Sequence, residues 1–368
     1  MKVGQLVSMD TGDLLPPELA EIMARLRADA DFMPPRQLRD VLDAEWSTGW
    51  RARFAQFDVR PIAAASIGQV HRARLPDGTD LAIKVQYPGI ARSIDSDVAN
   101  IGRLIRLSGL LPAGFDLGPY LEEARLQLRQ EADYGCEARH LAQFGRLLEN
   151  DPRFHVPRLH QPLSTGRVLA MEFVPSQAIE TLASASQQDR DTVAAALCGL
   201  VLHELFAFRV MQTDPNFANY RYDPDTERVV LLDFGATRAI SEDIASGLRR
   251  LMRAGMADSR ETVDAVLAEI GLLPTTVQDP FRTSILDMTM MVFEALRHGT
   301  VLDLRASDLS QRLQVQGEAL ARDGFVPPPV PMDLLFIQRK VAGMFLLATR
   351  LGARLPVTAL LAPYLETE

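Results

Sequence analysis

Cysteine is scarce in this sequence: its 368 residues include only Cys136 and Cys198, which lie 62 positions apart. That separation matches none of the short spacings of zinc sites or redox motifs, and a disulfide scaffold requires more cysteines. We therefore expect two small hydrophobic side chains in a reducing, intracellular compartment.

An excess of positive charge is also absent. The chain has 39 Lys and Arg against 48 Asp and Glu, a formal net charge of −9. Proteins that bind nucleic acid need a basic surface to displace counterions from phosphates. Nucleic acid is therefore excluded from the predicted partners, and the dispersed acidity indicates a soluble surface.

Long hydrophobic runs are missing as well. Lys2 is followed closely by Asp10 and Asp13, a pattern that no secretory signal has, and two Arg and two Pro interrupt the apolar stretch 341–365. A spanning helix needs about 20 largely uncharged residues. We expect a cytoplasmic protein with no spanning segment and at most peripheral contact with the inner membrane. Residues 345–361 are the candidate for that contact, although core packing is favoured.

Hydrophobic periodicity predicts an α+β chain, with strands first and helices later. Helical spacing dominates before residue 60. Strands are expected within 62–74, 81–86 and 168–174, helices over 94–107 and 120–148, and a hairpin over 219–232. We predict a bilobal fold with a cleft between the lobes. Its parts would be an N-terminal helical extension (1–60), a small strand-rich N-lobe with inserted helices (61–175) and a large helical C-lobe (176–368).

Two late motifs have the spacing of a kinase catalytic loop and its metal-binding aspartate. An Asp-Phe-Gly tripeptide begins at Asp233, and Asp214 and Asn219 form the Asp-x-x-x-x-Asn spacing without the usual His-Arg lead. Each motif alone is more often a turn, but their ordered spacing favours the kinase interpretation. Because Mg²⁺ prefers hard oxygen ligands, we expect Asn219 and Asp233 to hold it and Asp214 to be the catalytic base.

A lysine on a predicted strand precedes these motifs. The run Leu-Ala-Ile-Lys ending at Lys84 matches the kinase strand whose lysine contacts the α- and β-phosphates. This apolar run should be buried, so the ammonium needs a carboxylate partner. We choose Glu137 for that ion pair, with Glu131 as the alternative.

The segment before Lys84 stands where kinases have a glycine-rich loop, but it has few glycines. The third glycine and the valine of the kinase pattern are present, whereas the first two glycines are replaced by alanine. An added Cβ limits how closely backbone approaches phosphate, so we predict a nucleotide geometry unlike that of ordinary kinases. The expected nucleotide contacts in this loop are Ala63, Ala64, Ala65, Ser66, Gly68 and Val70.

The peptide-binding platform of a protein kinase is absent. Ser241, a favourable helix N-cap, follows Gly235 after only six residues, and no Ala-Pro-Glu motif intervenes. Phosphorylation of proteins is therefore disfavoured.

Taken together, these motifs resemble those of the UbiB (AarF-domain) family of atypical, protein-kinase-like proteins, in its coenzyme Q branch. The resemblance rests on Lys-Val-Gly-Gln at 2–5, Ala-Ala-Ala-Ser at 63–66, Glu-Ala-Asp at 131–133, Gln-Thr-Asp-Pro-Asn at 212–216 and Asp-Phe-Gly-Ala-Thr-Arg at 233–238. It covers nearly the whole chain, including Gln-Arg-Lys-Val-Ala-Gly at 338–343.

The resemblance implies a regulatory role for two of these motifs. In the family, the first motif folds over the active site and, with Glu-x-Asp, occludes the pocket where a peptide would dock. By similarity, Lys2 and Gln5 would lie near Glu131 and Asp133. Only Met1 precedes Lys2, so the helix that comes before this motif in the family is missing from this sequence: either the start is truncated or the true start lies upstream.

The resemblance also implies how the nucleotide is held and used. Residues 171–174 would form the hinge facing adenine, with the backbones of Glu172 and Val174 as contacts. Family members are thought to hydrolyse ATP or phosphorylate a small molecule in support of ubiquinone synthesis near membranes. The implied cofactors are ATP and Mg²⁺, and the implied partners are a lipid or quinone precursor and quinone-biosynthesis proteins.

An alternative interpretation is a pseudokinase binding module. The alanine-rich loop and the missing peptide platform favour a protein that uses nucleotide only to switch its binding of a lipid or biosynthetic partner. An ordinary protein kinase would rest on the fold alone, which is a weak warrant. An aminoglycoside-type phosphotransferase would leave Lys-x-Gly-Gln unexplained.

Overall fold

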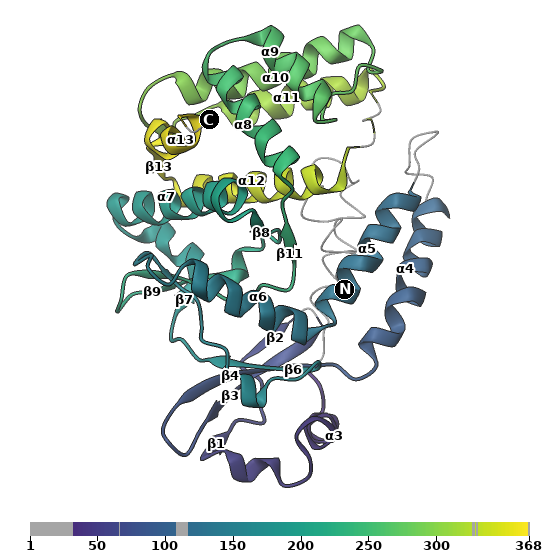
Figure 1. Ribbon diagram of the computed structural model, residues 1–368, viewed down its shortest axis with the longest axis vertical. Coiled ribbons are helices and arrows are strands. Elements are labelled where there is room, and N and C mark those ends of the chain that lie inside the picture. Colours follow the sequence, from purple (N-terminus) through teal and green to yellow (C-terminus); the bar gives the residue numbers. More distant parts are fainter. Residues whose placement is uncertain (1–31, 66, 108–116, 326–327, 329, 367–368) are drawn as a thin grey trace. The chain divides into compact units, whose positions relative to one another are not determined.

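The computed structural model describes residues 32–65, 67–107, 117–325, 328 and 330–366, and the chain divides into two compact units (Figure 1). The first unit consists of the chain up to Ser176 together with Arg221–Ala236. The second consists of Gln177–Tyr220 and the chain from Thr237 onward. Segment 221–236, which we expected in the helical C-lobe, thus belongs to the first unit. The predicted domain ranges otherwise remain a prediction.

An antiparallel sheet of five strands forms the first unit's main layer. Its order is β1-β3-β4-β6. Strand β2 pairs with β3 on the edge away from β4, the edge that β1 also uses, through Ala63–Val70 and Ala65–Gly68. The strands are β1 (Gln56–Phe57), β2 (Ala63–Ala65), β3 (Gly68–Arg74), β4 (Asp80–Gln86) and β6 (Val168–Glu172). These bounds confirm the strands predicted within 62–74 and 81–86, and end the third strand two residues earlier than expected. Gly78 takes φ of 90° in the turn between β3 and β4, a conformation that favours glycine.

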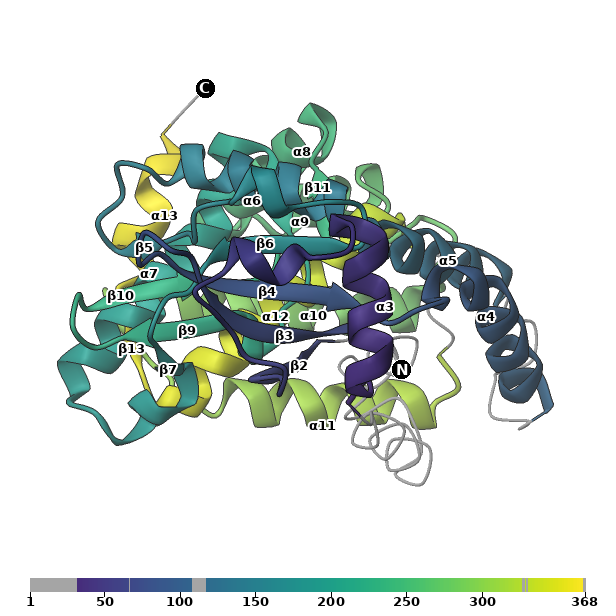
Figure 2. The same ribbon diagram turned by 90° about the horizontal axis from the view of Figure 1, so that it is seen from below.

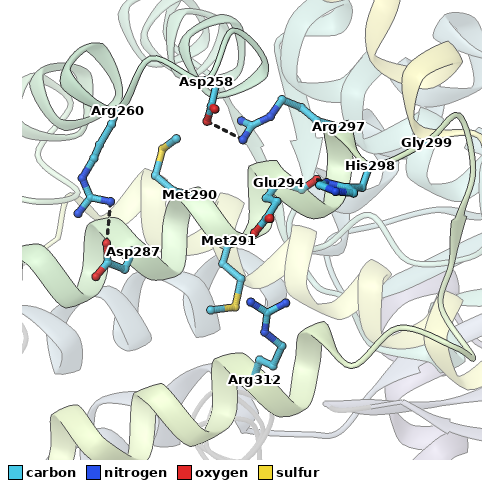
Figure 3. A pocket seen from close by; sticks show the side chains of 10 residues that line it. All are labelled: Asp258, Arg260, Asp287, Met290, Met291, Glu294, Arg297, His298, Gly299 and Arg312. Carbon is cyan, nitrogen blue, oxygen red and sulfur yellow. Dashed lines mark hydrogen bonds and ion pairs between the residues drawn. The ribbon is translucent and has the colours of Figure 1, made fainter.

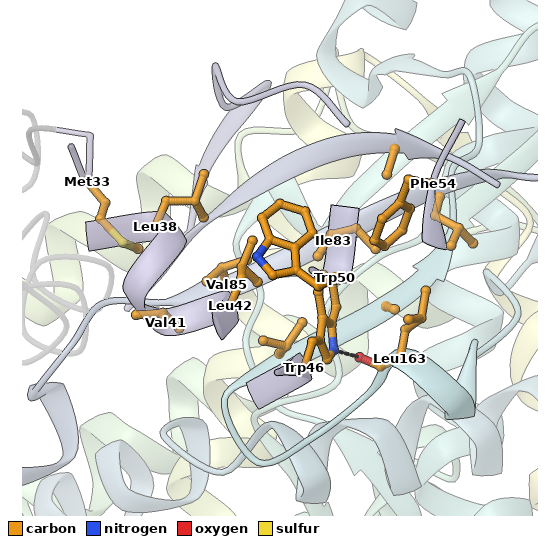
Figure 4. Close-up of a cluster of buried hydrophobic side chains, with 14 residues drawn as sticks. Met33, Leu38, Val41, Leu42, Trp46, Trp50, Phe54, Ile83, Val85 and Leu163 are labelled. Carbon is orange, nitrogen blue, oxygen red and sulfur yellow. Dashed lines mark hydrogen bonds between the residues drawn. The ribbon is translucent and has the colours of Figure 1, made fainter. Parts of the chain in front are cut away.

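The described part of the N-terminal extension packs on this sheet. Helix α3 (Pro35–Trp46) begins directly after Pro34 and is followed by the 3₁₀ turn η1 (Trp50–Arg53). Figure 4 shows the resulting cluster of buried side chains, in which Trp46 and Trp50 pack edge to face with ring centroids 5.7 Å apart. The same cluster includes Ile83 and Val85 of β4. The extension therefore shares one hydrophobic core with the strands.

Three helices follow β4, where we predicted two. They are α4 (Ile90–Leu107), α5 (Gly118–Glu131) and α6 (Tyr134–Leu147). The single helix predicted over 120–148 is wrong because Asp133 interrupts it. Its backbone is extended and its carboxylate accepts a hydrogen bond from Gly135 N at 2.9 Å, so it caps α6. Helices α4 and α5 lie side by side in both views (Figures 1 and 2).

The predicted hairpin over 219–232 is confirmed as β9 (Tyr220–Asp223) and β10 (Arg228–Leu231). Strand β10 pairs in parallel with the short strand β5 (Phe154–His155), through Val229 and Phe154. This pairing is the physical reason why segment 221–236 joins the first unit.

The second unit is mainly helical, as predicted. After β7 (Gln177–Ala178) and the 3₁₀ helix η3 (Ile179–Ser184), its helices are α7 (Gln187–His203), the π-helical turn η4 (Glu204–Phe208), η5 (Phe217–Asn219), α8 (Glu242–Met256), α9 (Arg260–Glu269), α10 (Asp279–Arg297), α11 (Leu309–Arg322), α12 (Met332–Leu351) and α13 (Val357–Leu365). The second unit also contains two antiparallel strand pairs. Strand β8 (Val210–Gln212) pairs with β11 (Thr237–Ala239), and β12 (Leu302–Asp303) pairs with β13 (Arg354–Leu355). Ser241 caps α8 by accepting from Ile244 N, as expected.

One stretch of the second unit, Gln187–Phe208, is long and apolar enough to cross a membrane by length and composition alone. The expectation that no segment spans a membrane stays a prediction. The mean hydropathy of this stretch is 1.5, and 56% of the apolar window is buried inside the protein. Core helices of soluble proteins meet the same criterion. Charged residues near both ends, such as Asp189 and Glu204, make the stretch inconspicuous in the sequence.

The predicted site of peripheral membrane contact, residues 345–361, lies largely in a core cluster. Ala348, Leu355 and Leu361 are buried in it, whereas Leu346 is exposed. Core packing, the favoured interpretation of this stretch, accounts for most of its apolar residues.

Candidate active site

Lys84, on β4, forms the predicted ion pair with Glu137 in the first unit. Its Nζ lies 2.8 Å from Oε1 and 2.9 Å from Oε2 of that carboxylate, and 3.2 Å from Oδ2 of Asp233. The side chains of Lys84 and Glu137 are 8% and 2% exposed. One buried cation is therefore shared by two carboxylates that lie 96 positions apart in the sequence.

The surroundings keep Lys84 charged. Burial lowers the pKa of its ammonium, but the carboxylates of Asp233 and Glu137 outweigh burial and hold the pKa well above its usual value. The Nζ also lies 5.1 Å from the ring centroid of the buried Tyr134. A fixed cation of this kind suits contact with phosphate oxygens.

Side chains on one face of helix α6 contact Lys84 and the Asp-Phe-Gly segment. Glu137 reaches Lys84, the Nδ1 of His140 lies 3.2 Å from the carbonyl oxygen of Phe234, and Phe144 packs on the Phe234 ring with centroids 4.8 Å apart. These residues stand at helical spacing, so they line one side of α6. Burial lowers the pKa of His140, which favours a neutral ring that donates to the carbonyl. Sequence reasoning missed His140 and Phe144, although their spacing from Glu137 was a usable signal.

Asp233 is held in a defined orientation. Its Oδ1 accepts a hydrogen bond from Gly235 N at 2.9 Å, while Oδ2 faces Lys84. Glu131, at the end of α5, is buried and lies beside Gly235, since a Cβ built there would be 3.7 Å from Glu131 Cγ. The two acidic residues of the Glu-x-Asp motif thus lie in different surroundings: Glu131 is next to the Asp-Phe-Gly turn, and Asp133 caps α6.

The alanine-rich loop is a tight hairpin of β2 and β3. Ala63 and Ala64 are exposed, Ala65 pairs with Gly68, and Val70 pairs with Lys84 across the sheet. Ser66, like Lys2 and Gln5, lies outside the described residues, so the roles predicted for these three residues stay predictions.

Gly68 has no room for a side chain. A Cβ there would lie 2.3 Å from the carbonyl oxygen of Val85 and 2.7 Å from Tyr134 Oη. We expect Gly68→Ala to lower the free energy of unfolding by about 1–3 kcal/mol, because the backbone of β4 must shift. Gly166→Ala is the matched control, since nothing lies within 4 Å of its added methyl group. Equal thermal midpoints of the two variants would contradict this expectation.

Backbone groups of both predicted hinge residues make hydrogen bonds. Glu172 N donates to the carbonyl of Arg158 at 2.8 Å, and the carbonyl of Val174 accepts from Ser176 Oγ at 3.1 Å. The adenine contacts predicted for these two backbones stay a prediction. The Glu172 side chain is turned to Arg158 and to His155, 3.3 Å away.

Asp214 and Asn219 meet in the second unit. Asn219 Nδ2 donates to Asp214 Oδ2 at 3.0 Å, and Asp214 Oδ1 accepts from Asn216 N at 3.4 Å. Arg339 of α12 adds a cation 3.7 Å from Asp214 Oδ1. The Asp-x-x-x-x-Asn spacing thus places a carboxylate and an amide side by side. Arg339 was noticed in the sequence only as part of a family motif, without a role.

The predicted metal ligands suit Mg²⁺ by their chemistry. Within the described ranges, no three His, Cys, Asp or Glu side chains gather into a metal site. Asp233 and Asn219, which belong to different units, supply carboxylate and amide oxygens, and the Asn219 nitrogen is already used by Asp214. Mg²⁺ characteristically takes few protein oxygens and completes its shell with water and phosphate. Each of the two side chains by itself offers an oxygen of the kind that this ion takes.

A separate cavity of about 920 Å³ lies in the second unit (Figure 3). Met290 and Met291 of α10 line it together with Arg312 of α11, and two ion pairs, Arg260–Asp287 and Arg297–Asp258, stand at its rim. None of the residues predicted from the sequence for nucleotide or metal lines this cavity.

Comparison with known proteins places these features in context. Residues 25–267 match the family model described as the ABC1 atypical kinase-like domain. The chain is 36% identical over 356 residues to the atypical kinase COQ8, mitochondrial, of Saccharomyces cerevisiae, covering 96% of this chain and 70% of the yeast protein. It is 36% identical to the rat and 35% identical to the zebrafish atypical kinase COQ8B, mitochondrial, spanning 67% and 56% of those proteins.

A solved structure is similar over the whole chain. The complex of Rv3197 with erythromycin from Mycobacterium tuberculosis superposes with a TM-score of 0.73 at 25% identity, covering 100% of this chain and 93% of that one. The likeness therefore includes both the strand-rich and the helical parts.

Proposed function

Because the chain belongs to the ABC1 (UbiB) atypical kinase-like family, in its coenzyme Q branch, we propose that it binds ATP with Mg²⁺ and transfers the γ-phosphoryl group to water or to a small molecule. The family resemblance read from the sequence and the α+β, kinase-like fold are thereby confirmed. The acceptor and the reaction are the proposal.

The observation that carries the proposal is the buried contact of Lys84 with Glu137 and Asp233. Kinases require a strand lysine paired with a helix glutamate, and an aspartate of the Asp-Phe-Gly segment for the metal. All three side chains are present in one unit at hydrogen-bonding distance. A lysine serving only stability would more simply be an apolar residue, since buried ion pairs are often replaced without loss of stability.

The proposed roles follow from chemistry. Lys84 would contact the α- and β-phosphates, while Glu137 holds it in place. Asp233 and Asn219 would hold Mg²⁺, which when bound neutralises charge on the phosphates. Asp214 would orient the acceptor and take its proton, with the backbones of Glu172 and Val174 as adenine contacts. The short segment between Gly235 and Ser241 disfavours a peptide acceptor.

We further propose that this activity supports ubiquinone biosynthesis, with a lipid or quinone precursor as ligand and quinone-biosynthesis proteins as partners. The support is the similarity to proteins named COQ8. Those relatives are named mitochondrial; for this chain, the cytoplasmic placement with peripheral membrane contact remains a prediction.

Thermal unfolding with ADP or ATP, with and without Mg²⁺, tests nucleotide binding. A ligand at 100 times its Kd should add about 2.7 kcal/mol of stability to the wild type. Asp233→Asn should lose the part of this gain that depends on Mg²⁺, because an amide is a poorer ligand than a carboxylate for that ion. No gain with either nucleotide would contradict the proposal.

The pseudokinase alternative makes a different prediction. Ala63 and Ala65, which stand where kinases have the first two glycines of their loop, are the observation that favours it. Under this alternative, nucleotide stabilises the protein but no phosphate is released, with or without phenolic or lipid additives. Phosphate release that depends on Asp214 would exclude it.

A further inference from the structure

Lys340, on α12, is buried in the second unit with 1% of its surface exposed. Its Nζ donates to Gln212 Oε1 at 2.9 Å and to Tyr220 Oη at 2.5 Å. Glu204 Oε2, at the start of the π-helical turn, lies 3.7 Å away and is equally buried. A buried ammonium is costly, and an apolar side chain could fill the same space. The contacts of Lys340 therefore call for a reason beyond packing.

The network around Lys340 has one consistent set of donors and acceptors. Burial raises the pKa of Tyr220, so its phenol keeps a proton and donates to Gln212 Oε1 at 3.2 Å while accepting from Lys340. Burial lowers the pKa of Lys340, but the nearby Glu204 and Tyr220 outweigh it, and the ammonium stays charged. Glu204 Oε1 in turn accepts from Gln212 N at 3.3 Å.

The two partners of Lys340 stand at the ends of the segment that carries the proposed catalytic groups. Gln212 lies two residues before Asp214, and Tyr220 directly follows Asn219. We call residues 212–220 the catalytic segment. Lys340 joins its two ends from outside, while the Asn219–Asp214 hydrogen bond joins its interior.

Two neighbours of Lys340 on α12 contact the same segment. Arg339 Nη2 lies 3.7 Å from Asp214 Oδ1. Gly343 lies one helical turn beyond Arg339, where an added Cβ would be 2.2 Å from Pro215 Cβ, so glycine is required for this approach of the helix. Three residues within about one turn of α12 thus contact the catalytic segment. Lys340 contacts its two ends, Arg339 lies near the Asp214 carboxylate, and Gly343 lies against Pro215.

We infer that Lys340 is a positioning residue, which ties Gln212 to Tyr220 and so presents Asp214 and Asn219 in a fixed geometry. The inference rests on the proposed function, in which Asp214 is the base and Asn219 a Mg²⁺ ligand. Lys340 acts through its two partners. Fixing this geometry matters because a displacement of about 1 Å at reacting groups can cost roughly 100-fold in rate.

Tyr220→Phe is the informative variant, because it removes one of the two anchors while keeping the ring beside Lys340. Tyr364→Phe is the control: its hydroxyl makes a partly buried hydrogen bond in the second unit, 2.9 Å from His203 Nδ1, and no residue of the catalytic segment takes part in that bond. Lys340→Met is the direct test, and Tyr220→Phe keeps the inference testable if that variant does not fold.

Two measurements on the full chain decide the inference. Hydrogen exchange should show lost protection at the amides of 212–220, including Asn219 N, which donates to Asn216 O at 2.9 Å. At saturating Mg²⁺-ATP, kcat should fall about tenfold or more in Tyr220→Phe. The Kd for ADP without Mg²⁺ should stay within about twofold, because that binding does not need the segment. Tyr364→Phe, which also removes one tyrosine hydroxyl, should change neither the protection of 212–220 nor kcat.

The outcomes distinguish a failure of the positioning role of Lys340 from a failure of the proposed phosphoryl-transfer function. Unchanged protection of 212–220 in Tyr220→Phe would overturn the positioning role, as would a kcat equal to that of Tyr364→Phe. If the wild type turns over no ATP, the proposed function fails. Hydrogen exchange then still decides whether Lys340 and Tyr220 hold the segment.

Discussion

Replacing Asp214 by Asn should lower kcat for Mg²⁺-dependent ATP turnover by about 10²–10⁴-fold, the usual range for a positioned general base. Asn fills the same volume and can still bond to Asn219, whose nitrogen donates to the residue at position 214. What the variant loses is the negative charge beside Arg339 and the ability to take a proton. The catalytic segment should therefore keep its shape while its chemistry is lost.

The measurement is phosphate release at saturating Mg²⁺-ATP, together with thermal stabilisation by Mg²⁺-ADP. Stabilisation should persist in Asp214→Asn, because the nucleotide contacts proposed for Lys84 and Asp233 are untouched. Asp323→Asn, an exposed residue after α11, is the control for loss of one carboxylate. Turnover in Asp214→Asn equal to that of this control would show that Asp214 is not the base.

The second large effect concerns the buried pair of Lys84 and Glu137. Removing the cation, as in Lys84→Met, should lower the free energy of unfolding by about 3–5 kcal/mol, because the Glu137 carboxylate stays buried without that cation. Glu137→Leu should cost less, because Asp233 still pairs with Lys84. Replacing both Lys84 and Glu137 should cost less than Lys84→Met alone. Asp233, the third member, is 23% exposed and can be hydrated.

Denaturant unfolding of the four members of this cycle gives the coupling energy. The pair Arg250–Glu269 in the second unit is the control, because its side chains are 46% and 55% exposed. Its cycle should yield less than about 1 kcal/mol. Additive losses at Lys84 and Glu137 would contradict the buried pair. Nucleotide stabilisation should be lost in every variant that lacks Lys84.

The sequence alone predicted those site residues that belong to short local motifs. A lysine at the end of an apolar strand, an aspartate after another strand and a short Asp-to-Asn spacing are local patterns, visible without the fold. The need of a buried ammonium for a carboxylate predicted a glutamate partner for Lys84, with Glu137 preferred and Glu131 as the alternative, and the structure pairs Lys84 with Glu137. The sequence did not predict the break between the helices α5 and α6. The hydrophobic spacing over 120–148 is continuous, whereas in the structure Asp133 caps a new helix.

By itself, the sequence determined the class of the fold, the strands around Lys84 and the identity of the charged groups, because these depend on local periodicity and on short spacings. Only the tertiary structure decided which distant groups meet. It joined Lys84 to Asp233 across 149 positions and Lys340 to Gln212 across 128. It also placed segment 221–236 in the first unit, through the pairing of β10 with β5. Buried charges and strand edges need hydrogen-bonding partners, and the fold determines which groups lie close enough to provide them. A local sequence pattern does not contain this information.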